Sequence, residues 1–489
     1  TSLWEPWLQS LLSAIKPFSP SFAPLAWASL LGLGLASCSG EAQLLGKPAK
    51  RAPLPKGIEL VFNHSDTSRY RSPITGQWRQ GDDLEAFVLA SIQQAKREIL
   101  VAVQELSLPK VAEALVARHR EGLTVKVVLE NTYSTPWSEE NPIGLAPHKR
   151  NRHHQLQALG WGDAVAILQR AGVPLIDDTA DGSAGSGLMH HKFMVVDRAV
   201  VVTGSANFTP SCIHGDPGGD PSGDPGSNRS RGNVNHLLRL HSSALAASFV
   251  AEFERMWGDG PGGQSDSRFG LAKGGGAAQR ALVGQTPVTV LFAPHRRKDP
   301  NQGLGLLEKL LLGTRKQLDL ALFVLSEQGL ADAMASLQER GVKIRLLADP
   351  GFANRAFSEV LDLLGIQLPD HRCGLEAGNR PWQKPLEGVG TPRLASGDKL
   401  HHKLAVIDNR TVITGSFNWS PSAAHQNDET LLVFDSSLLA AHFTAEINRL
   451  WKGAELGLTP RLQRKIERQR LSCGSGVQRG ITQANTTGG

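Results

Sequence analysis

One string of residues occurs twice in this 489-residue chain. Its first copy is His190-His191-Lys192, then Asp197, then Gly204-Ser205-Ala206-Asn207. Its second copy is His401-His402-Lys403, then Asp408, then Gly415-Ser416-Phe417-Asn418. The shared residues have the same spacing in both copies, which composition alone does not produce. Such a repeat predicts two similar halves that each deliver the same polar side chains to one place.

The repeat extends beyond the motif. Each motif is preceded by an apolar segment, an amphipathic segment and a second apolar segment. In the first half these are residues 99–103, 111–117 and 125–130, and in the second half 318–325, 330–337 and 344–349. These patterns predict strand, helix and strand. After each motif, apolar residues recur at helical spacing, which predicts core positions for Trp257 and Trp451. The order indicates an α/β protein with a duplicated half.

The halves differ in length after the motif. The motif histidines are 211 positions apart and the two tryptophans 194, so the first half carries 17 additional residues there. We assign them to the Gly/Asp/Pro tract at 215–226, which should be a mobile loop because it has little apolar surface to bury. The boundaries that follow are a tether at 38–56, a first half at 57–258, a Gly-rich linker at 259–286, a second half at 287–455 and a basic tail at 456–489. We expect a solvated tail, with a lipid or nucleic-acid contact as the alternative.

Each motif combines groups that suit a phosphodiester. His and Lys two positions apart on a strand face the same way, and Gly-Ser-x-Asn fits a tight turn that a ligand can approach closely. The residues expected to bind phosphate oxygens, where transition-state charge develops, are Lys192, Ser205, Asn207, Lys403, Ser416 and Asn418. Asp197 and Asp408 are expected to hold strand and turn together.

Two histidines allow a two-step displacement. A neutral histidine attacks phosphorus and forms phosphohistidine, while a protonated one gives its proton to the leaving alkoxide and later activates water. Two motifs are needed because attack and departure occur on opposite faces of phosphorus. No acidic cluster or metal-spaced histidine set accompanies the motifs, so we predict catalysis without metal or cofactor. Zinc binding by the adjacent pairs His190/His191 or His401/His402 is disfavoured because neighbouring strand residues face opposite ways.

The twice-occurring pattern His-x-Lys-x4-Asp-x6-Gly-Ser-x-Asn resembles the signature of the phospholipase D superfamily, and the similarity covers roughly residues 57–455. The resemblance implies two α-β-α sandwich halves about a pseudo-twofold axis, with a pseudo-dimeric active site at their junction in a monomer. It places His190, Lys192 and Asn207 opposite His401, Lys403 and Asn418. In related two-motif enzymes the N-terminal histidine is the nucleophile, which implies His190 as nucleophile and His401 as acid/base.

The two motif copies are unequal in one further position. Many family members have an acidic residue about 28 positions after the motif histidine that orients a histidine. The second half has Glu429 there, but the first half, corrected for its insertion, has Asn235. Asparagine accepts a hydrogen bond without adding negative charge, so we expect the two catalytic histidines to differ in basicity.

The N-terminal 37 residues are expected to be a signal peptide because an apolar run of about 16 residues ends at Leu35-Ala36-Ser37-Cys38. This ending resembles a lipoprotein signal, so we expect lipidation of Cys38 and an exported, membrane-anchored protein. A plain signal peptide, giving a periplasmic or extracellular protein, and an uncleaved anchor are the alternatives. The other cysteines are Cys212, Cys373 and Cys473, which argues against a disulfide framework or zinc site but leaves one bridge open.

The favoured function is hydrolysis of a phospholipid headgroup phosphodiester, and the alternative is an exported endonuclease acting on DNA or RNA. Basic clusters at 148–150, 152–154 and 295–298 could hold a phosphate backbone or be solvated loops. A net charge of +6 fits either substrate, and 6% aromatic residues give little sign of base stacking. Two intact motifs argue against a non-catalytic scaffold. Substrate choice is expected from loops 131–154, 177–189 and 374–399, and an alcohol in place of water as acceptor stays open.

Overall fold

The computed structural model describes residues 52–74, 76, 78–183, 185–215, 230–474 and 478–481, which belong to one compact unit beginning at Ala49. The expected signal segment, Cys38 and nearly all of the Gly/Asp/Pro tract lie outside the described residues. Among the helices that are described, none has the length and apolar character needed to cross a membrane.

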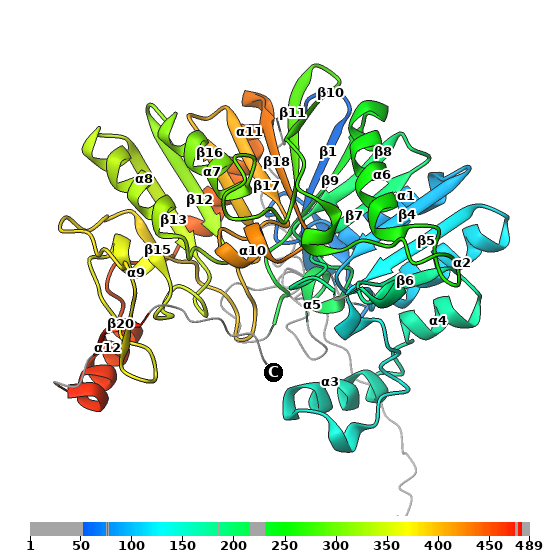
Figure 1. Cartoon of the computed structure of the whole chain (residues 1–489), viewed down its shortest axis with the longest axis horizontal. Coiled ribbons are helices and arrows are strands. Elements are labelled where there is room, and N and C mark those ends of the chain that lie inside the picture. The colour runs from blue at the N-terminus through cyan, green and yellow to red at the C-terminus, as the bar shows by residue number, and fades with distance from the viewer. Residues whose placement is uncertain are drawn as a thin grey trace, which may run out of the picture. The chain divides into compact units, whose positions relative to one another are not determined.

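The first half is built on a mixed seven-stranded sheet (Figure 1). In spatial order its strands are β1 (Ile58–Phe62), β9 (His236–His241), β8 (Val200–Gly204), β7 (Lys192–Val196), β4 (Glu98–Val103), β5 (Thr124–Leu129) and β6 (Leu175–Asp177). Strands β4, β5 and β6 run parallel, whereas β7 is antiparallel to β4. Ile99 to Val103 are all buried, which explains why β4 has a continuous apolar sequence rather than an alternating one.

The second half repeats this plan in a nine-stranded sheet. In spatial order its strands are β10 (Gln279–Val283), β11 (Thr286–Ala293), β18 (Glu429–Asp435), β17 (Thr411–Gly415), β16 (Lys403–Ile407), β12 (Gln317–Leu322), β13 (Lys343–Ala348), β15 (Val389–Thr391) and β19 (Glu455–Leu456). The series β18-β17-β16-β12-β13 corresponds to β9-β8-β7-β4-β5 of the first sheet, with the same strand directions. The predicted duplication of an α/β half is confirmed.

Helices cover both faces of each sheet, because alternate strand residues point to opposite sides. On one face of the first sheet lie α1 (Leu84–Gln94), α2 (Pro109–Arg120) and α4 (Ala164–Arg170), and on the matching face of the second lie α7 (Gly303–Leu312), α8 (Gln328–Glu339), α9 (Glu359–Leu363) and α10 (Pro421–His425). The opposite faces carry α6 (Ser243–Trp257) and α11 (Ser437–Trp451). The first half also contains α3 (Pro147–Ala158), α5 (Pro210–Ile213) and a small ladder of β2 (Arg69–Arg71) and β3 (Trp78–Gln80).

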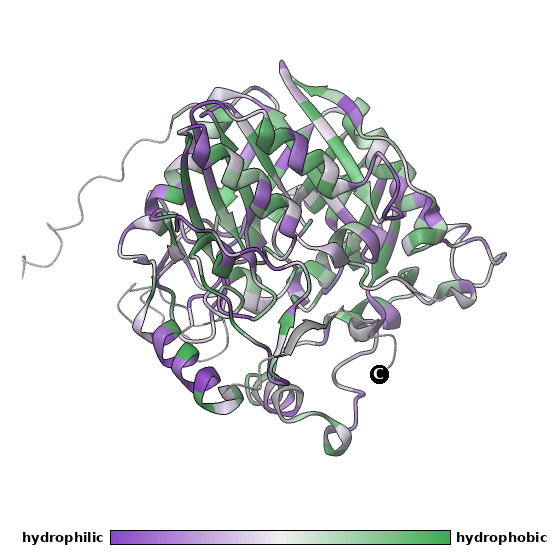
Figure 2. Ribbon diagram, turned by 60° about the vertical axis from the view of Figure 1, so that its left-hand side comes forward, coloured by the Kyte–Doolittle hydropathy of each residue, from purple (hydrophilic) through white to green (hydrophobic). Residues whose placement is uncertain are grey.

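One apolar core joins the halves, and the strands around it are predominantly green in Figure 2. Helix α6 contributes Phe249 and α11 contributes Phe443, both fully buried. Phe62 of β1 meets Phe443 edge-on, with ring centroids 5.4 Å apart, so a first-half strand packs on a second-half helix. Trp257 is 2% exposed in this core and Trp451 packs against it, as their helical spacing predicted.

The predicted Gly-rich linker is in part regular structure. Residues 279–283 form β10, which pairs antiparallel with β11 through a turn at Gly284. Lys273, which is also in this stretch, makes ion pairs with Glu252 of α6 and with Asp428 of the second half. The prediction followed glycine content, whereas pairing with β11 and a buried ionic contact fix the segment. It therefore belongs to the second sheet and links the two halves.

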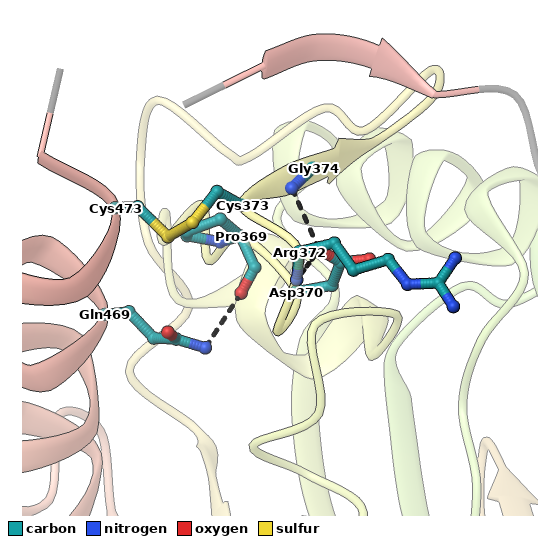
Figure 3. Close-up of a disulfide and its surroundings, with 7 residues drawn as sticks. All are labelled: Pro369, Asp370, Arg372, Cys373, Gly374, Gln469 and Cys473. Atoms are coloured by element: carbon teal, nitrogen blue, oxygen red, sulfur yellow. Dashed lines mark hydrogen bonds between the residues drawn. A yellow bond between two sulfur atoms is a disulfide. The ribbon is translucent and has the colours of Figure 1, made fainter. Parts of the chain in front are cut away.

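The basic tail is also ordered, contrary to the expected solvated end. Pro460–Cys473 form α12, whose Leu462 is 1% exposed and packs with Leu361 and Leu368. Cys473 is disulfide-bonded to Cys373, and Gln469 Nε2 donates to the Pro369 carbonyl at 3.2 Å (Figure 3). The bridge that the cysteine count left open is formed. After the disulfide, β20 (Gln478–Ile481) pairs with β14 (Gly374–Glu376).

Breaking this disulfide should loosen the C-terminal helix. The bridge closes a separation of 100 residues, and Cys473→Ser should lower the free energy of unfolding by about 2–4 kcal/mol. Because α12 is rich in arginine, trypsin should cut it sooner in the variant than in the wild-type protein. Cys373→Ser and the double variant should behave like Cys473→Ser. If trypsin cuts the wild-type protein equally fast with and without reductant, the disulfide does not hold α12 in place.

Candidate active site

The two motifs meet where the halves adjoin. Just before each motif, the backbone forms a short parallel β-bridge with the other half. Met189 pairs with Asp428, and Leu400 pairs with Val234. His190 N donates to the Asp428 carbonyl at 2.9 Å, and His401 N donates to the Val234 carbonyl at 3.1 Å. The charges of both motif lysines act on each of these histidines. The structure thus brings the predicted pair of histidines and the predicted pair of lysines into one site.

Each catalytic histidine is oriented by a residue of the opposite half. His190 Nδ1 lies 2.8 Å from the Glu429 carboxylate, and His401 Nδ1 lies 3.0 Å from Asn235 Oδ1. The sequence identified Glu429 and Asn235 as equivalent positions, but their spacing did not reveal that the contacts cross between halves. The carboxylate serves the first-half histidine and the amide serves the second-half histidine.

The motif serines support these orienting residues. Ser416 Oγ donates to Glu429 at 2.6 Å, and Ser205 Oγ donates to Asn235 Oδ1 at 2.8 Å. Both serines are fully buried. Their expected phosphate contacts therefore need revision, because each hydroxyl proton is already engaged. We expect them to fix Glu429 and Asn235 rather than to hold phosphate.

The lysine and asparagine side chains leave donors for an anion. Lys192 Nζ donates to the His190 carbonyl at 2.9 Å and Lys403 Nζ to the His401 carbonyl at 2.8 Å. An ammonium group has three donors, so each lysine retains capacity for phosphate oxygens. Among the described contacts, Asn207 Nδ2 donates one hydrogen bond, to Gln104 Oε1 at 3.2 Å, so each motif asparagine keeps N–H donors for phosphate oxygens.

A pair of residues that the sequence analysis missed makes the site asymmetric. Gln104 directly follows β4, and its Oε1 accepts from Lys192 Nζ at 3.3 Å and from Asn207 Nδ2 at 3.2 Å. Phe323 directly follows β12, so it is the second-half counterpart of Gln104. Lys403 Nζ lies 4.8 Å from the Phe323 ring centroid, and this ring also contacts His401 at 4.9 Å. Gln104 directly follows the strand predicted at 99–103, whereas Phe323 lies inside the one predicted at 318–325, so the predicted elements held no common signal for the pair.

Burial sets the electrostatics of the site. Burial, reinforced by the two motif lysines, lowers the pKa of His190 and of His401 well below the usual range. Burial also lowers the pKa of Lys192 to about 8 and moves that of Lys403 well below its usual range. The pKa of Glu429 is raised to about 7, because burial outweighs the attraction of the lysines. Two ammonium groups and few carboxylates in a buried site favour an anionic ligand.

The second histidine of each motif has a separate, structural environment. His191 Nε2 lies 3.1 Å from Glu252 of α6, and His402 Nε2 lies 3.2 Å from Glu446 of α11. These contacts repeat the same strand-to-helix link in both halves. Adjacent motif histidines thus have different partners, as the alternation of strand residues predicted. Among the described residues, no group of three or more His, Cys, Asp or Glu side chains is arranged to hold a metal ion.

The motif aspartates hold strand ends, as expected. Asp197 accepts hydrogen bonds from the backbone N–H groups of Lys96, Arg97 and Glu98 at 2.7–3.0 Å, at the start of β4. Asp408 does the same for residues 315–317 before β12. Both have left-handed φ values, 52° and 51°, at the turn after the motif strand. They join this turn to the neighbouring strand and lie at the strand end opposite the motif histidines.

The basic clusters considered for nucleic-acid binding are structured differently from the expected loops. Residues 147–158 form helix α3. In the other cluster, His295 is fully buried, and its Nε2 lies 2.9 Å from the Gly276 carbonyl, while residues 296–298 are exposed. In loop 131–154, Trp137 and Glu140 line a pocket together with Glu105, the neighbour of Gln104. This pocket thus lies between one of the loops expected to govern substrate choice and the residue next to Gln104.

Known proteins resemble this chain in sequence. The family described as cardiolipin synthase, PLD-like domain, matches residues 88–257 and 307–451. The mitochondrial cardiolipin hydrolase of Xenopus laevis is 30% identical over 142 residues, 29% of this chain and 58% of that protein. A phospholipase D of Rickettsia prowazekii is 28% identical over 120 residues, 24% of this chain and 48% of that protein. The chain spans about half the length of the curated relatives it matches.

The fold has a solved counterpart. The phosphatidylserine synthase of Haemophilus influenzae Rd KW20 has a TM-score of 0.51 and 13% identity, and the match covers 86% of this chain and 95% of that one. At this identity the likeness concerns the fold alone. Together with the family match over more than half of its residues, it shows that the chain belongs to the phospholipase D superfamily and has that superfamily's two-half α/β fold.

Proposed function

We propose that this protein is a metal-independent phosphodiesterase of the phospholipase D type that hydrolyses the headgroup phosphodiester of a phospholipid. The observation that carries the proposal is the reciprocal site, in which each motif histidine is oriented from the opposite half beside two buried lysines. One site of this kind offers a nucleophile and an acid to opposite faces of one phosphorus atom.

In the first step, His190 Nε2 attacks phosphorus while Glu429 holds Nδ1–H. The bond from phosphorus to the leaving oxygen breaks, and His401, protonated when the bound phosphodiester anion offsets the lysine charges, gives its proton to that oxygen. In the second step, His401 takes a proton from water, the resulting hydroxide attacks phosphorus, and the phosphorus–nitrogen bond breaks. Lys192, Lys403 and the motif asparagines bind the nonbridging oxygens in both steps.

The unequal orienting residues favour His190 as nucleophile. Phosphohistidine with a proton on the other ring nitrogen carries positive charge, and a neighbouring carboxylate stabilises that charge. Glu429 provides the carboxylate for His190, whereas Asn235 provides only a neutral acceptor for His401. The acid/base role suits His401, because an amide partner leaves its proton easier to release.

Changing Asn235 to Asp should move the pH–rate profile. A carboxylate 3.0 Å from His401 Nδ1 raises the histidine pKa, so protonated His401 persists to higher pH and the alkaline limb of kcat/KM shifts upward. The shift should be about one to two pH units. Stability should fall somewhat, because Asn235 Nδ2 donates to the Cys212 carbonyl at 2.9 Å and aspartate cannot. An unchanged profile in a folded variant contradicts the assignment of His401 as acid.

The lipid substrate and the location of the protein belong to the proposal. Relatives named cardiolipin hydrolase and phospholipase D support a phospholipid substrate. We further propose export by the N-terminal segment and anchoring through lipidated Cys38 at a membrane surface. Palmitate labelling that is absent in Cys38→Ala is the expected result. A soluble, unlabelled wild-type protein contradicts the anchor.

The competing function is an endonuclease, which the positive net charge and the arginine-rich α12 also support. The deciding experiment gives purified protein, in EDTA, three substrates: phospholipid vesicles, single- and double-stranded DNA, and the soluble diester bis(p-nitrophenyl) phosphate. We expect cleavage of the lipid and the soluble diester. Cleavage of DNA and of the soluble diester, without cleavage of the lipid, selects the nuclease. Strict dependence on an added divalent metal overturns the mechanism.

A further inference from the structure

Helix α12 carries a stripe of cations. Arg461, Arg464, Lys465 and Arg468 follow the spacing i, i+3, i+4, i+7, which places them along one flank of a helix. The arginines are exposed and Lys465 is half-buried. Leu471, three positions after Arg468, is 77% exposed and continues the same flank. We call these four cations and Leu471 the α12 stripe.

The stripe faces outward because the other side of the helix is fixed to the protein. Leu462 and Ile466 pack with Leu361 and Leu368, and Cys473 is bonded to Cys373. Helix α12 is therefore held in one orientation, with its apolar edge already occupied. Its cationic flank remains available to a partner.

A series of contacts connects Lys465 of the stripe to His401. Lys465 Nζ donates to the Asn354 carbonyl at 2.5 Å, in the loop that carries Phe352. The Phe352 ring contacts that of Phe323 at 4.6 Å, and Phe323 contacts His401 at 4.9 Å. Figure 1 shows α12 at the same end of the second sheet as α10, the helix that follows the second motif. The loop that carries Phe352 thus links helix α12 to the His401 side of the active site.

The charge of the stripe is not balanced within the protein. Helix α12 contains one acidic residue, Glu467, and the described residues include no ion pair to any of the four cations. Arg355 adds a further positive charge that acts on Lys465. Like charges three and four positions apart destabilise a helix by a few tenths of a kcal/mol per pair. A segment that keeps such pairs and is nevertheless fixed by a disulfide is suited to an external anionic partner.

We propose that the α12 stripe docks the protein on an anionic phospholipid surface and so presents the active site to its substrate. The effect on lipid turnover rests on the proposed function, whereas surface binding does not depend on it. Clustered Lys and Arg bind anionic headgroups through their combined charge. Exposed Leu471, together with Leu458 at the other end of the helix (48% exposed), can enter the headgroup region.

The composition of the helix favours lipid over nucleic acid. Proteins that bind single strands combine cations with aromatic side chains on which bases stack. Helix α12 has no aromatic residue and is flanked by exposed leucines instead. A charged face edged by aliphatic side chains matches a bilayer surface, which offers phosphate groups above hydrocarbon.

The test compares two triple variants of the full chain, each in a Cys38→Ser background that removes any lipid anchor. The first is Arg461→Gln/Arg464→Gln/Arg468→Gln. The matched control, Arg315→Gln/Lys316→Gln/Lys343→Gln, removes three exposed cations before β12 and at the start of β13, at the strand ends away from the active site. Binding to phosphatidylglycerol/phosphatidylcholine vesicles, by co-sedimentation, and to DNA is measured at low and high salt. The kinetics of cleavage are measured for the vesicle lipid and for bis(p-nitrophenyl) phosphate.

Wild type and control should bind the anionic vesicles and release them at high salt. The stripe variant should lose affinity by about fivefold per charge, on the order of a hundredfold in all. With vesicle substrate its KM should rise at unchanged kcat, and cleavage of the soluble diester should match wild type. Equal losses in the control, or full vesicle binding by the stripe variant, overturn the proposal. If wild type binds DNA but no vesicles, and the stripe variant loses DNA binding, the stripe belongs to a nucleic-acid site. Absence of soluble-diester cleavage in every protein instead refutes the proposed function and leaves the binding result standing.

Discussion

His190→Ala is expected to lose at least about 10⁴-fold in kcat/KM on every phosphodiester substrate, because it removes the group that forms the covalent intermediate. His401→Ala should lose a similar factor on a lipid, whose alkoxide leaving group needs a proton. The two variants should differ on bis(p-nitrophenyl) phosphate. The p-nitrophenolate ion leaves without protonation, so His401→Ala should release a burst of one p-nitrophenolate per enzyme before turnover slows.

The control for these variants is His191→Asn, which alters the neighbouring histidine but not the reacting pair. His191 contacts Glu252 and Thr430, so this variant should lose stability and retain most of its turnover when folded. A burst from His190→Ala, with none from His401→Ala, reverses the two roles. Residual turnover within tenfold of wild type in either variant contradicts the two-histidine mechanism.

Glu429→Gln should lower catalytic activity while it raises the free energy of unfolding above pH 7. The carboxylate accepts from His190 Nδ1 and from Ser416 Oγ, and its charge stabilises positive charge on His190 during phosphoryl transfer. Glutamine keeps an acceptor but removes the charge and can misorient the ring, so kcat should fall about 10²–10⁴-fold. Its effect on folding should be the opposite of the effect on turnover.

The pKa of Glu429 accounts for the effect on folding. Burial raises this pKa to about 7, so the folded protein binds a proton that the unfolded chain has released above about pH 4.5. Stability attributable to this group therefore falls as pH rises from about 4.5 to 7, by about 3 kcal/mol in all. Glu429→Gln lacks this decline, and its free energy of unfolding should exceed that of wild type above pH 7. Chemical denaturation across this pH range, together with kcat, measures both effects. A variant that is less stable and fully active contradicts this role of Glu429.

Local sequence patterns predicted most of the architecture and most of the residues that form the site. Strand β4 is a continuous apolar run from Ile99 to Val103, and the motifs carry their own spacing, so each could be recognised without knowing its neighbours. The exchange of orienting residues between halves was not predictable in this way. Glu429 and His190 are 239 positions apart, and their contact depends on how the two sheets meet. No periodicity within either half records that arrangement.

The prediction that failed was based on composition. The arginine-rich tail was expected to be solvated, while glycine-rich residues 259–286 were expected only to join the halves. Lys273 nevertheless links two buried carboxylates, and α12 is fixed by Leu462 and Cys473. A few specific contacts outweighed the average character of each segment. Gln104 and Phe323 were missed for a different reason, since neither residue type signals a phosphate site by itself.

The account rests on a covalent link between His190 and the phosphoryl group of the substrate. The direct measurement uses His401→Asn and a phospholipid analogue with a p-nitrophenyl leaving group, quenched in base, in which phosphohistidine is stable, and mapped by mass spectrometry. We predict one phosphatidyl group per protein, on the peptide that contains His190, and none in His190→Asn/His401→Asn. Modification at His401 in wild-type protein, or rapid turnover with no modified histidine at any time, contradicts the account.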